Sequence, residues 1–136
     1  MLISDVSASE SEARYRLGDL EVMTKSGTTP SATLTVFDGA SAHEVTAQGD
    51  GAVDAALKAI EKVVCTNAVV ALYSVNAITK GTESQGEVTV RLEKDGRIVN
   101  GVGADTDIVI ASAKAYVDAA NLMVSQQKAH PQLEGV

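Results

Sequence analysis

Residues 32–64 read ATLTVFDGASAHEVTAQGDGAVDAALKAIEKVV, and their pattern predicts two strands followed by a helix. Leu34 and Val36 alternate with polar residues, as in a half-buried strand, and Asp38-Gly39 is a turn signal that leads into a second short strand around Val45 and Ala47. After a glycine-rich break, apolar residues recur at spacings of three and four, which is typical of the core-facing stripe of a helix: Val53, Ala56, Leu57, Ile60 and Val64. A further strand is predicted upstream, over residues 15–23, with an irregularity at Gly18-Asp19.

The second half of the chain repeats this order. Residues 69–78 are apolar and rich in β-branched side chains, Val88, Val90 and Leu92 alternate, and Asp95-Gly96 turns the chain into residues 97–102. A second helix then carries an alanine-rich stripe, which predicts close packing against another element: Ile108, Ala111, Ala115, Ala119 and Leu122.

Short matches support a duplication. Met23-Thr24-Lys25 corresponds to Ile78-Thr79-Lys80, Gly49 to Gly103, and the matches keep their order along both halves. The sequence therefore predicts an α+β fold of two βββα units related by a pseudo-twofold, with the sheets packed against helices. We expect a linker at residues 1–13, a domain over 14–125 and a polar C-terminal tail at 126–136. Within the domain, unit one covers about 14–66 and unit two about 67–125.

The composition of the chain argues against several classes of function. The 136 residues include 11 Lys and Arg against 18 Asp and Glu, and this net charge of −7 argues against a nucleic-acid binder, which needs a basic face. No apolar stretch approaches the ~20 residues of a membrane span, and no secretion signal is recognisable, so a cytoplasmic protein without membrane partners is expected. The single cysteine, Cys65, suits a reducing compartment and a small apolar role.

Catalytic and metal-binding patterns are missing from the sequence. The two histidines, His43 and His130, are far apart and lack neighbouring Cys or His residues at zinc-site spacing. Nucleophile-elbow, phosphate-loop and His-Glu-x-x-His motifs are absent as well. We therefore expect neither a catalytic site nor a cofactor in this chain.

Two glycine-rich segments precede the two predicted helices at equivalent places: Gly49-Asp50-Gly51 and Gly103-Ala104-Asp105. Free N–H groups in the first turn of a helix form an anion site, and glycine lets a ligand approach the backbone. The alternative is that the glycines only make tight turns and that aspartates, Asp105 and Asp107 among them, cap the helices. Both interpretations are open from the sequence.

The acidic residues around these segments favour one ligand class. Asp50, Asp54, Asp105 and Asp107 would repel a polyphosphate, and no lysine lies within either glycine motif. An amino acid fits better, because its carboxylate could bind helix N–H groups while its ammonium meets a carbonyl or an aspartate. A pocket lined by apolar residues would suit a small aliphatic side chain, and the candidates are Val53, Val70, Tyr73 and Ala77.

Several segments together resemble the C-terminal regulatory domain of 2-isopropylmalate synthase. They are GEVTVRL at 86–92, GVGADTDI at 101–108, ASAKAY at 111–116, YRL at 15–17, GDGAVDA at 49–55 and HPQLE at 130–134. The resemblance runs from about Arg14 to the C-terminus. The family often has proline after the first Gly-Asp-Gly, where this chain has Ala52. The family's catalytic barrel, with its metal-binding His and Asp residues, has no counterpart here.

The resemblance implies feedback inhibition by leucine, homodimerisation, and association with the catalytic barrel of the synthase, which would hold the divalent metal. By the same analogy the leucine site would be formed by Gly49, Asp50, Gly51, Val53, Val70, Tyr73, Ala77, Ser84, Ala104, Asp105, Thr106 and Asp107.

Three other interpretations are open. The related regulatory domain of citramalate synthase senses isoleucine, which differs from leucine only in the position of one methyl group. A structural dimerisation module would bind no ligand. A small enzyme would use Asp54 or Asp107 as acid or base, but no His, Lys or Ser stands beside either one to assist it.

Overall fold

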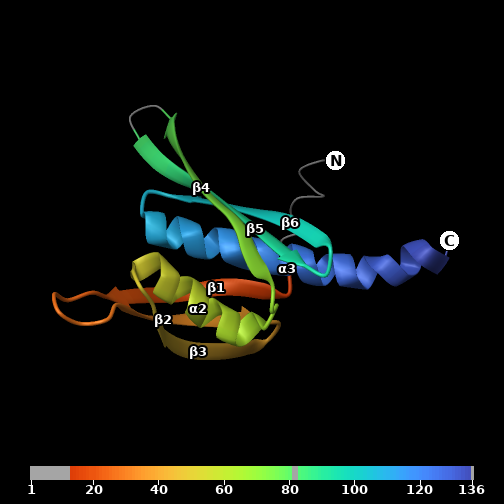
Figure 1. The fold of residues 1–136 in the computed structure, drawn as a ribbon, viewed down its shortest axis with the longest axis horizontal. Helices are drawn as coiled ribbons and strands as arrows, with labels where there is room; N and C mark the ends of the chain where they lie inside the picture. The colour runs from red at the N-terminus through yellow and green to blue at the C-terminus, as the bar shows by residue number, and fades with distance from the viewer. Residues whose placement is uncertain (1–12, 81–82, 136) are drawn as a thin grey trace.

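The computed structural model describes residues 13–80 and 83–135. The chain forms three strands and a helix, and then repeats that order, as Figure 1 shows. The first unit comprises β1 (Tyr15–Met23), β2 (Ser31–Asp38), β3 (Ser41–Gln48) and α2 (Ala52–Val64). The second comprises β4 (Val69–Lys80), β5 (Glu83–Lys94), β6 (Arg97–Asp105) and α3 (Ile108–Gly135). The predicted α+β fold of two βββα units is confirmed.

Each unit has its own antiparallel sheet, in the order β1-β2-β3 and β4-β5-β6. The pairing of β1 with β2 shifts register between Leu17 and Leu20, so the predicted irregularity at Gly18-Asp19 is a β-bulge. A second shift, between Val70 and Leu72, interrupts the pairing of β4 with β5. The bulge therefore lies on the first strand of both units.

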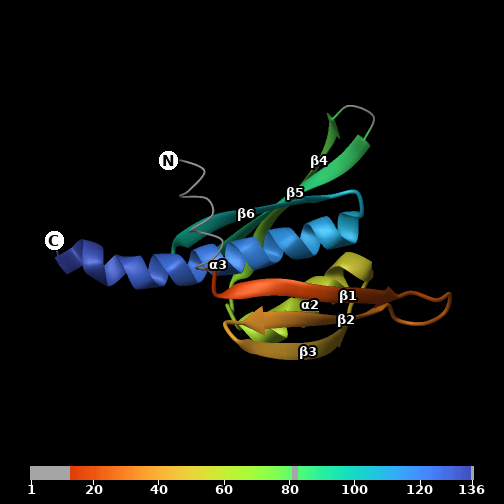
Figure 2. The ribbon, with the colours of Figure 1, turned by 180° about the vertical axis from the view of Figure 1, so that it is seen from behind.

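The sheets and helices share one core. In Figures 1 and 2, α3 lies along β6 and passes over β1, while α2 lies against the sheet of unit one. The largest fully buried apolar side chains come from both units: Leu34, Val36, Ile60, Val88, Val90 and Leu92. The alternation and the helical spacing seen in the sequence thus point these side chains inward.

The alanine stripe of α3 packs directly on two glycines of β6. A Cβ atom on Gly103 would lie 2.5 Å from the carbonyl oxygen of Ala111 and 2.6 Å from the amide nitrogen of Ala115. A Cβ atom on Gly101 would meet the backbone of Ala115 and Ala119. Helix and strand therefore approach one another at a distance that only small residues allow, as the alanine-rich stripe predicts.

The length of α3 requires a correction to the sequence interpretation. Its first 18 residues, Ile108–Ser125, have a mean hydropathy of 1.2, so one stretch is long and apolar enough to span a membrane by composition. Half of that stretch is buried inside the protein, which fits the central helix of a folded core. The helix also continues to Gly135, through the segment expected to be a polar tail.

Candidate functional site

The starts of the two helices lie at the same end of the molecule. Figures 1 and 2, seen from opposite sides, both place the beginning of α2 beside the beginning of α3. The fold therefore brings together the two glycine-rich segments that the sequence singles out, at residues 49–51 and 103–105.

The start of α2 is open. Gly51 is its N-cap residue in extended conformation, with φ −156° and ψ 179°, and no side chain caps the first turn. The N–H groups of residues 52–54 have no partner within a helix that begins at Ala52, because the first intrahelical bond joins the Ala55 amide to the Gly51 carbonyl over 2.9 Å. Three N–H groups at this end of the helix therefore lack a capping side chain, and such groups are the kind that bind a carboxylate in other proteins.

Two acidic residues flank this open helix start and differ in their contacts. The Asp54 carboxylate accepts the Asp50 amide proton over 2.9 Å and lies 3.1 Å from the Lys58 ammonium. The Asp50 hydrogen bond, followed by Lys58, lowers the pKa of Asp54 below its ordinary value. The Asp50 side chain is exposed, and its carboxylate contacts no donor among the described residues. Asp50 is therefore available to an ammonium group.

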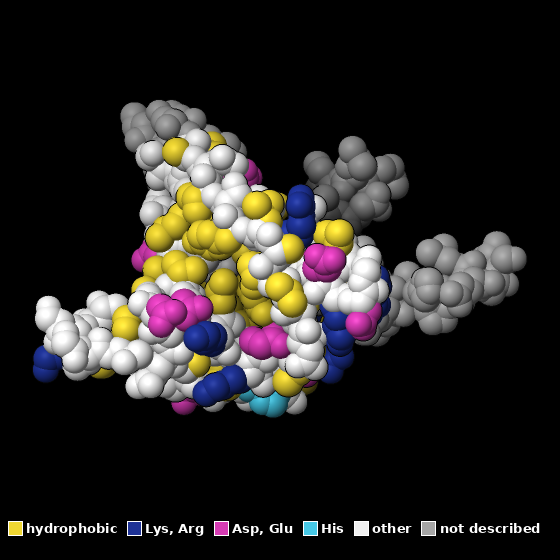
Figure 3. Space-filling view, in the orientation of Figure 1, with side chains coloured by type: hydrophobic (Ala, Val, Ile, Leu, Met, Phe, Trp, Pro, Cys, Tyr) yellow, Lys and Arg dark blue, Asp and Glu magenta, His cyan; other side chains and the backbone are white. Residues whose placement is uncertain are grey.

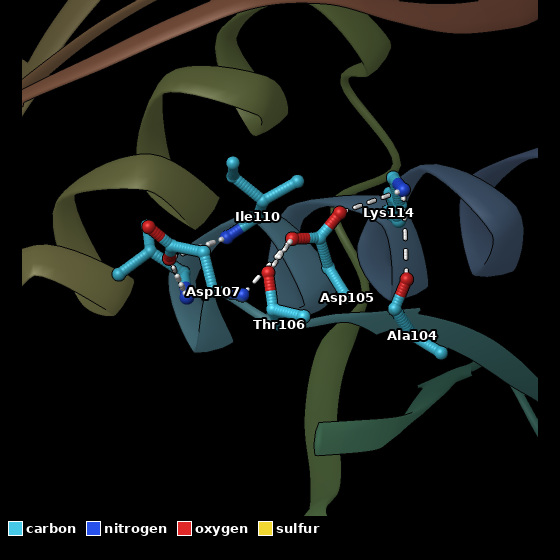
Figure 4. A network of polar contacts seen from close by, with 7 residues as sticks. Ala104, Asp105, Thr106, Asp107, Ile110 and Lys114 are labelled. Atoms are coloured by element: carbon cyan, nitrogen blue, oxygen red, sulfur yellow. Dashed lines mark hydrogen bonds and ion pairs between the residues drawn. The ribbon is translucent and has the colours of Figure 1, made fainter. Parts of the chain in front are cut away.

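The start of α3 is filled, in the sense that neighbouring side chains already accept its N–H groups (Figure 4). Asp107 Oδ1 accepts the amide protons of Val109 and Ile110, over 2.8 and 3.3 Å. Asp105 accepts the Asp107 amide proton over 2.9 Å and pairs with Lys114 at 3.1 Å. The backbone hydrogen bond is the larger cause, and the lysine the second, of a lowered pKa at Asp105. The aspartates therefore cap α3, and the two helix starts are not equivalent.

The two glycines before α2 have different surroundings. A Cβ atom on Gly49 would lie 2.5 Å from the Ala55 amide nitrogen, so the chain leaves no room there. A Cβ atom on Gly51 would meet nothing within 4 Å. Gly49 is thus required by packing, whereas the space beside Gly51 is free for a ligand.

Three predicted apolar residues share one face of β4. Val70, Tyr73 and Ala77 lie opposite Leu92, Val90 and Gly86 of β5, whose face is turned toward α3. Gly86 is close to α3, since a Cβ atom there would lie 2.7 Å from Cδ1 of Ile108.

The Tyr73 hydroxyl contacts the first turns of α3. It lies 2.6 Å from the Ser112 hydroxyl, which donates to the Ile108 carbonyl over 2.7 Å. Because the Ser112 proton is used in that bond, Tyr73 is the donor to Ser112. The fold therefore brings Tyr73, and Ala77 through its neighbour Gly86, to the start of α3, whereas Val70 lies further along β4.

The remaining predicted site residues, Ser84, Ala104 and Thr106, do not lie at the open start of α2. Ser84 pairs with Thr79 where β4 ends and β5 begins, and these strand ends project away from both helices in Figure 1. The Ala104 carbonyl lies 3.5 Å from the Lys114 ammonium, and the Thr106 hydroxyl lies 3.5 Å from Asp105, so both belong to the filled start of α3.

Two residues at this end of the molecule were not among the predicted site residues. Ser112 is fully buried below Tyr73, and Lys114 neutralises Asp105. Ser112 interrupts an otherwise apolar helical stripe, and Lys114 lies on the polar side of the same helix. Neither position in the sequence predicts its partner, because the partners, Tyr73 and Asp105, come from strands that precede the helix in the chain.

A cavity of about 300 Å³ lies elsewhere, at the C-terminal end of α2. Its walls are formed by Arg14, Tyr15, Val63, Val64, Cys65, Thr66, Lys94, Met123 and Val124, none of which is a predicted site residue. Within residues 13–80 and 83–135, no group of three or more His, Cys, Asp or Glu residues could hold a metal ion.

These features define a class of protein: a duplicated α+β domain of two βββα units whose helix starts lie at the same end, one capped by aspartates and the other without a side-chain cap. A family model described as the LeuA allosteric (dimerisation) domain matches residues 1–124. The chain therefore belongs to the family of LeuA allosteric (dimerisation) domains, and the resemblance seen in the sequence is confirmed.

Relatives with about half of their aligned residues identical are named 2-isopropylmalate synthase. The protein of Methylococcus capsulatus is 53% identical over 136 residues, which cover 99% of this chain and 26% of that protein. The protein of Chromobacterium violaceum is 51% identical over 131 residues, covering 96% of this chain and 26% of that protein. The chain thus spans about a quarter of the length of these curated relatives.

Proposed function

We propose that this chain is the leucine-sensing regulatory domain of a 2-isopropylmalate synthase and that it acts as a homodimer in the cytoplasm. Family membership supports the regulatory role, and the names of the relatives support the synthase. The catalytic barrel would then be a separate part of the enzyme, and it would hold the divalent metal.

The observation that carries leucine as the effector is the open start of α2 beside Asp50. The free N–H groups of residues 52–54 would bind the carboxylate of the amino acid, and the Asp50 carboxylate would accept its ammonium. Charge-assisted hydrogen bonds at both groups would orient the ligand. The filled start of α3 would contact the ligand without donating hydrogen bonds to it, because Asp107 already accepts the N–H groups of Val109 and Ile110.

The apolar part of the ligand would lie toward the strand face of unit two. Val53, which is half-buried, and the exposed Val70 and Tyr73 are the candidates for this contact. Burial of an isobutyl group should contribute about 1.5–3 kcal/mol. Regulation requires that leucine favour one arrangement of the units or of the dimer, with a typical coupling of about 1–3 kcal/mol.

Calorimetric titration of the 136-residue chain with leucine, isoleucine and valine tests this proposal. Leucine should bind with measurable heat and raise the melting temperature, and isoleucine and valine should bind more weakly. Tighter binding of isoleucine would assign the domain to an isoleucine-sensing synthase instead. If none of the three amino acids gives heat or stabilisation at millimolar concentration, the domain is a dimerisation module without an effector.

A further inference from the structure

The Asn121 side chain of α3 holds the first residue of β1 at both of its backbone groups. Its Oδ1 atom accepts the Tyr15 amide proton over 2.8 Å, and its Nδ2 atom donates to the Tyr15 carbonyl over 2.9 Å. β1 lies at the edge of its sheet, and the side-chain amide takes the place that a neighbouring strand would have there. These bonds join residues 106 positions apart in the sequence, so they tie the helix of unit two to the beginning of unit one.

The first turns of the same helix lie at the proposed effector site. Ser112, in the second turn of α3, is hydrogen-bonded to Tyr73 over 2.6 Å. Tyr73 belongs to the apolar face of β4, and Figure 3 shows hydrophobic side chains gathered on the front of the molecule between β4 and α2. A ligand at the open start of α2 would lie against this face. One helix therefore contacts both the proposed ligand-binding end and the start of β1.

These two contacts of α3 lie well apart. Figures 1 and 2 both place the beginning of β1 at the opposite end of the molecule from the starts of α2 and α3. Asn121 follows Ser112 by nine positions, which corresponds to roughly 14 Å along a helix. A ligand at the open start of α2 therefore cannot touch Tyr15, and any effect on Tyr15 has to pass through the packed elements between them.

The packing beside Tyr15 leaves room for a small movement. The cavity of about 300 Å³ at the C-terminal end of α2 is bordered by Arg14 and Tyr15 of the first unit and by Met123 and Val124 of α3. Protein interiors are otherwise close-packed, so groups that border a cavity can shift where their neighbours cannot. The contact between α3 and β1 is thus placed where a displacement of the helix can move the strand without disrupting the core.

We propose that Asn121 is a positioning residue in regulation, which carries a change at the effector end of α3 to Tyr15 and to the segment before it. In the enzyme proposed above, that segment, the expected linker at residues 1–13, joins the regulatory domain to the catalytic barrel. The inference rests on the proposed function and deepens it, because it names the contact through which ligand binding reaches the linker.

Amide signals of the ¹⁵N-labelled 136-residue chain, followed during titration with leucine, test this coupling. The signals of residues 52–54 report the ligand. Those of Arg16 and Leu17 report β1, and the described structure gives neither residue a hydrogen bond to Asn121. Both groups of signals should shift with the same dependence on leucine concentration. Shifts at residues 52–54 alone would overturn the inference and leave the proposed function standing, whereas no shift in either group would overturn both.

Two variants then test the role of Asn121 itself. Asn121→Ala removes both bonds, and Asn121→Asp keeps the size of the side chain but sets a carboxylate oxygen against the Tyr15 carbonyl. Both variants should bind leucine within about fivefold of the parent affinity, the lower end of typical coupling, because the ligand does not touch Asn121. The shifts of Arg16 and Leu17 should disappear in both. Loss of leucine binding would overturn the inference, because Asn121 would then be needed for the site itself.

Asn100→Ala is the matched control. Asn100 of β6 accepts a hydrogen bond from Arg91 over 2.9 Å at an exposed position, so this variant also loses an asparagine hydrogen bond. Its response to leucine should equal that of the parent in both groups of signals. If Asn121 were only structural, its variants would melt at a lower temperature and keep the shifts of β1, and this result would overturn the inference. Circular dichroism verifies that all variants fold.

Discussion

Tyr116 of α3 donates a hydrogen bond to Glu61 of α2 over 2.8 Å, and this partly buried contact joins the two units. The same carboxylate accepts the Thr66 hydroxyl and the Asn67 amide, each over 2.8 Å. Thr66 and Asn67 belong to the connection that leads into β4. Glu61 therefore connects three parts of the fold: the end of α2, the first half of α3 and the beginning of unit two.

Tyr116→Phe should destabilise the domain by about 1.5–3 kcal/mol, because the partly buried carboxylate of Glu61 loses a donor. Burial and the Glu61 bond raise the pKa of Tyr116 above its ordinary value, so the phenol is protonated at neutral pH. The parent protein therefore has this hydrogen bond at neutral pH, and the variant loses all of it. Urea unfolding measures the change. Tyr15→Phe is the control, because the Tyr15 hydroxyl makes no hydrogen bond to the described residues, and its unfolding midpoint should hardly move.

Gly103→Ala should destabilise the domain by about 2 kcal/mol, since the new methyl group would press on the backbone of α3. Gly51→Ala places the same methyl group in open space, and its cost should stay below about 1 kcal/mol, the loss of a favourable N-cap residue. Thermal unfolding compares the two. Equal losses would mean that β6 and α3 are less closely packed than described.

Gly51→Asp should abolish leucine binding and leave the fold intact. Asp is a favourable N-cap residue, so its carboxylate would occupy the N–H groups that the ligand carboxylate needs. Calorimetry should show affinity reduced by roughly 100-fold or more, the loss expected for one or two charge-assisted hydrogen bonds. Gly51→Ala should still bind. Normal leucine binding by Gly51→Asp would place the effector elsewhere.

Stability should fall as the pH drops below about 4. The folded-state pKa values of Asp54 and Asp105 are lowered from 3.8, so each contributes stability that is present above this value. That contribution is lost as the pH falls through the lower folded-state pKa. Asp54→Asn with Asp105→Asn should flatten the dependence of the urea midpoint on pH between about 5 and 2.5. An unchanged slope would show that other carboxylates dominate.

Local patterns were sufficient for most of the fold. Alternation placed Leu34, Val36, Val88 and Val90 in the core, and the bulge near Gly18 followed from a glycine inside a strand. The contacts of Glu61 with Tyr116 were not predictable, because 55 residues separate the two in sequence and only the packing of α2 on α3 brings them together.

The two βββα units, their turns and the helix starts were predictable from the sequence, because strand and helix periodicity are properties of short segments. Long-range packing sets which helix start has no side-chain cap and which strand keeps exposed apolar side chains. Two similar glycine segments diverge because the Asp107 carboxylate turns back onto its own helix, whereas Asp54 bonds to the preceding loop at Asp50. The backbone of β4 stays more than 8 Å from the described parts of both helices, and only the Tyr73 side chain reaches α3, because the placement of α2 and α3 depends on long-range packing, which no local pattern encodes.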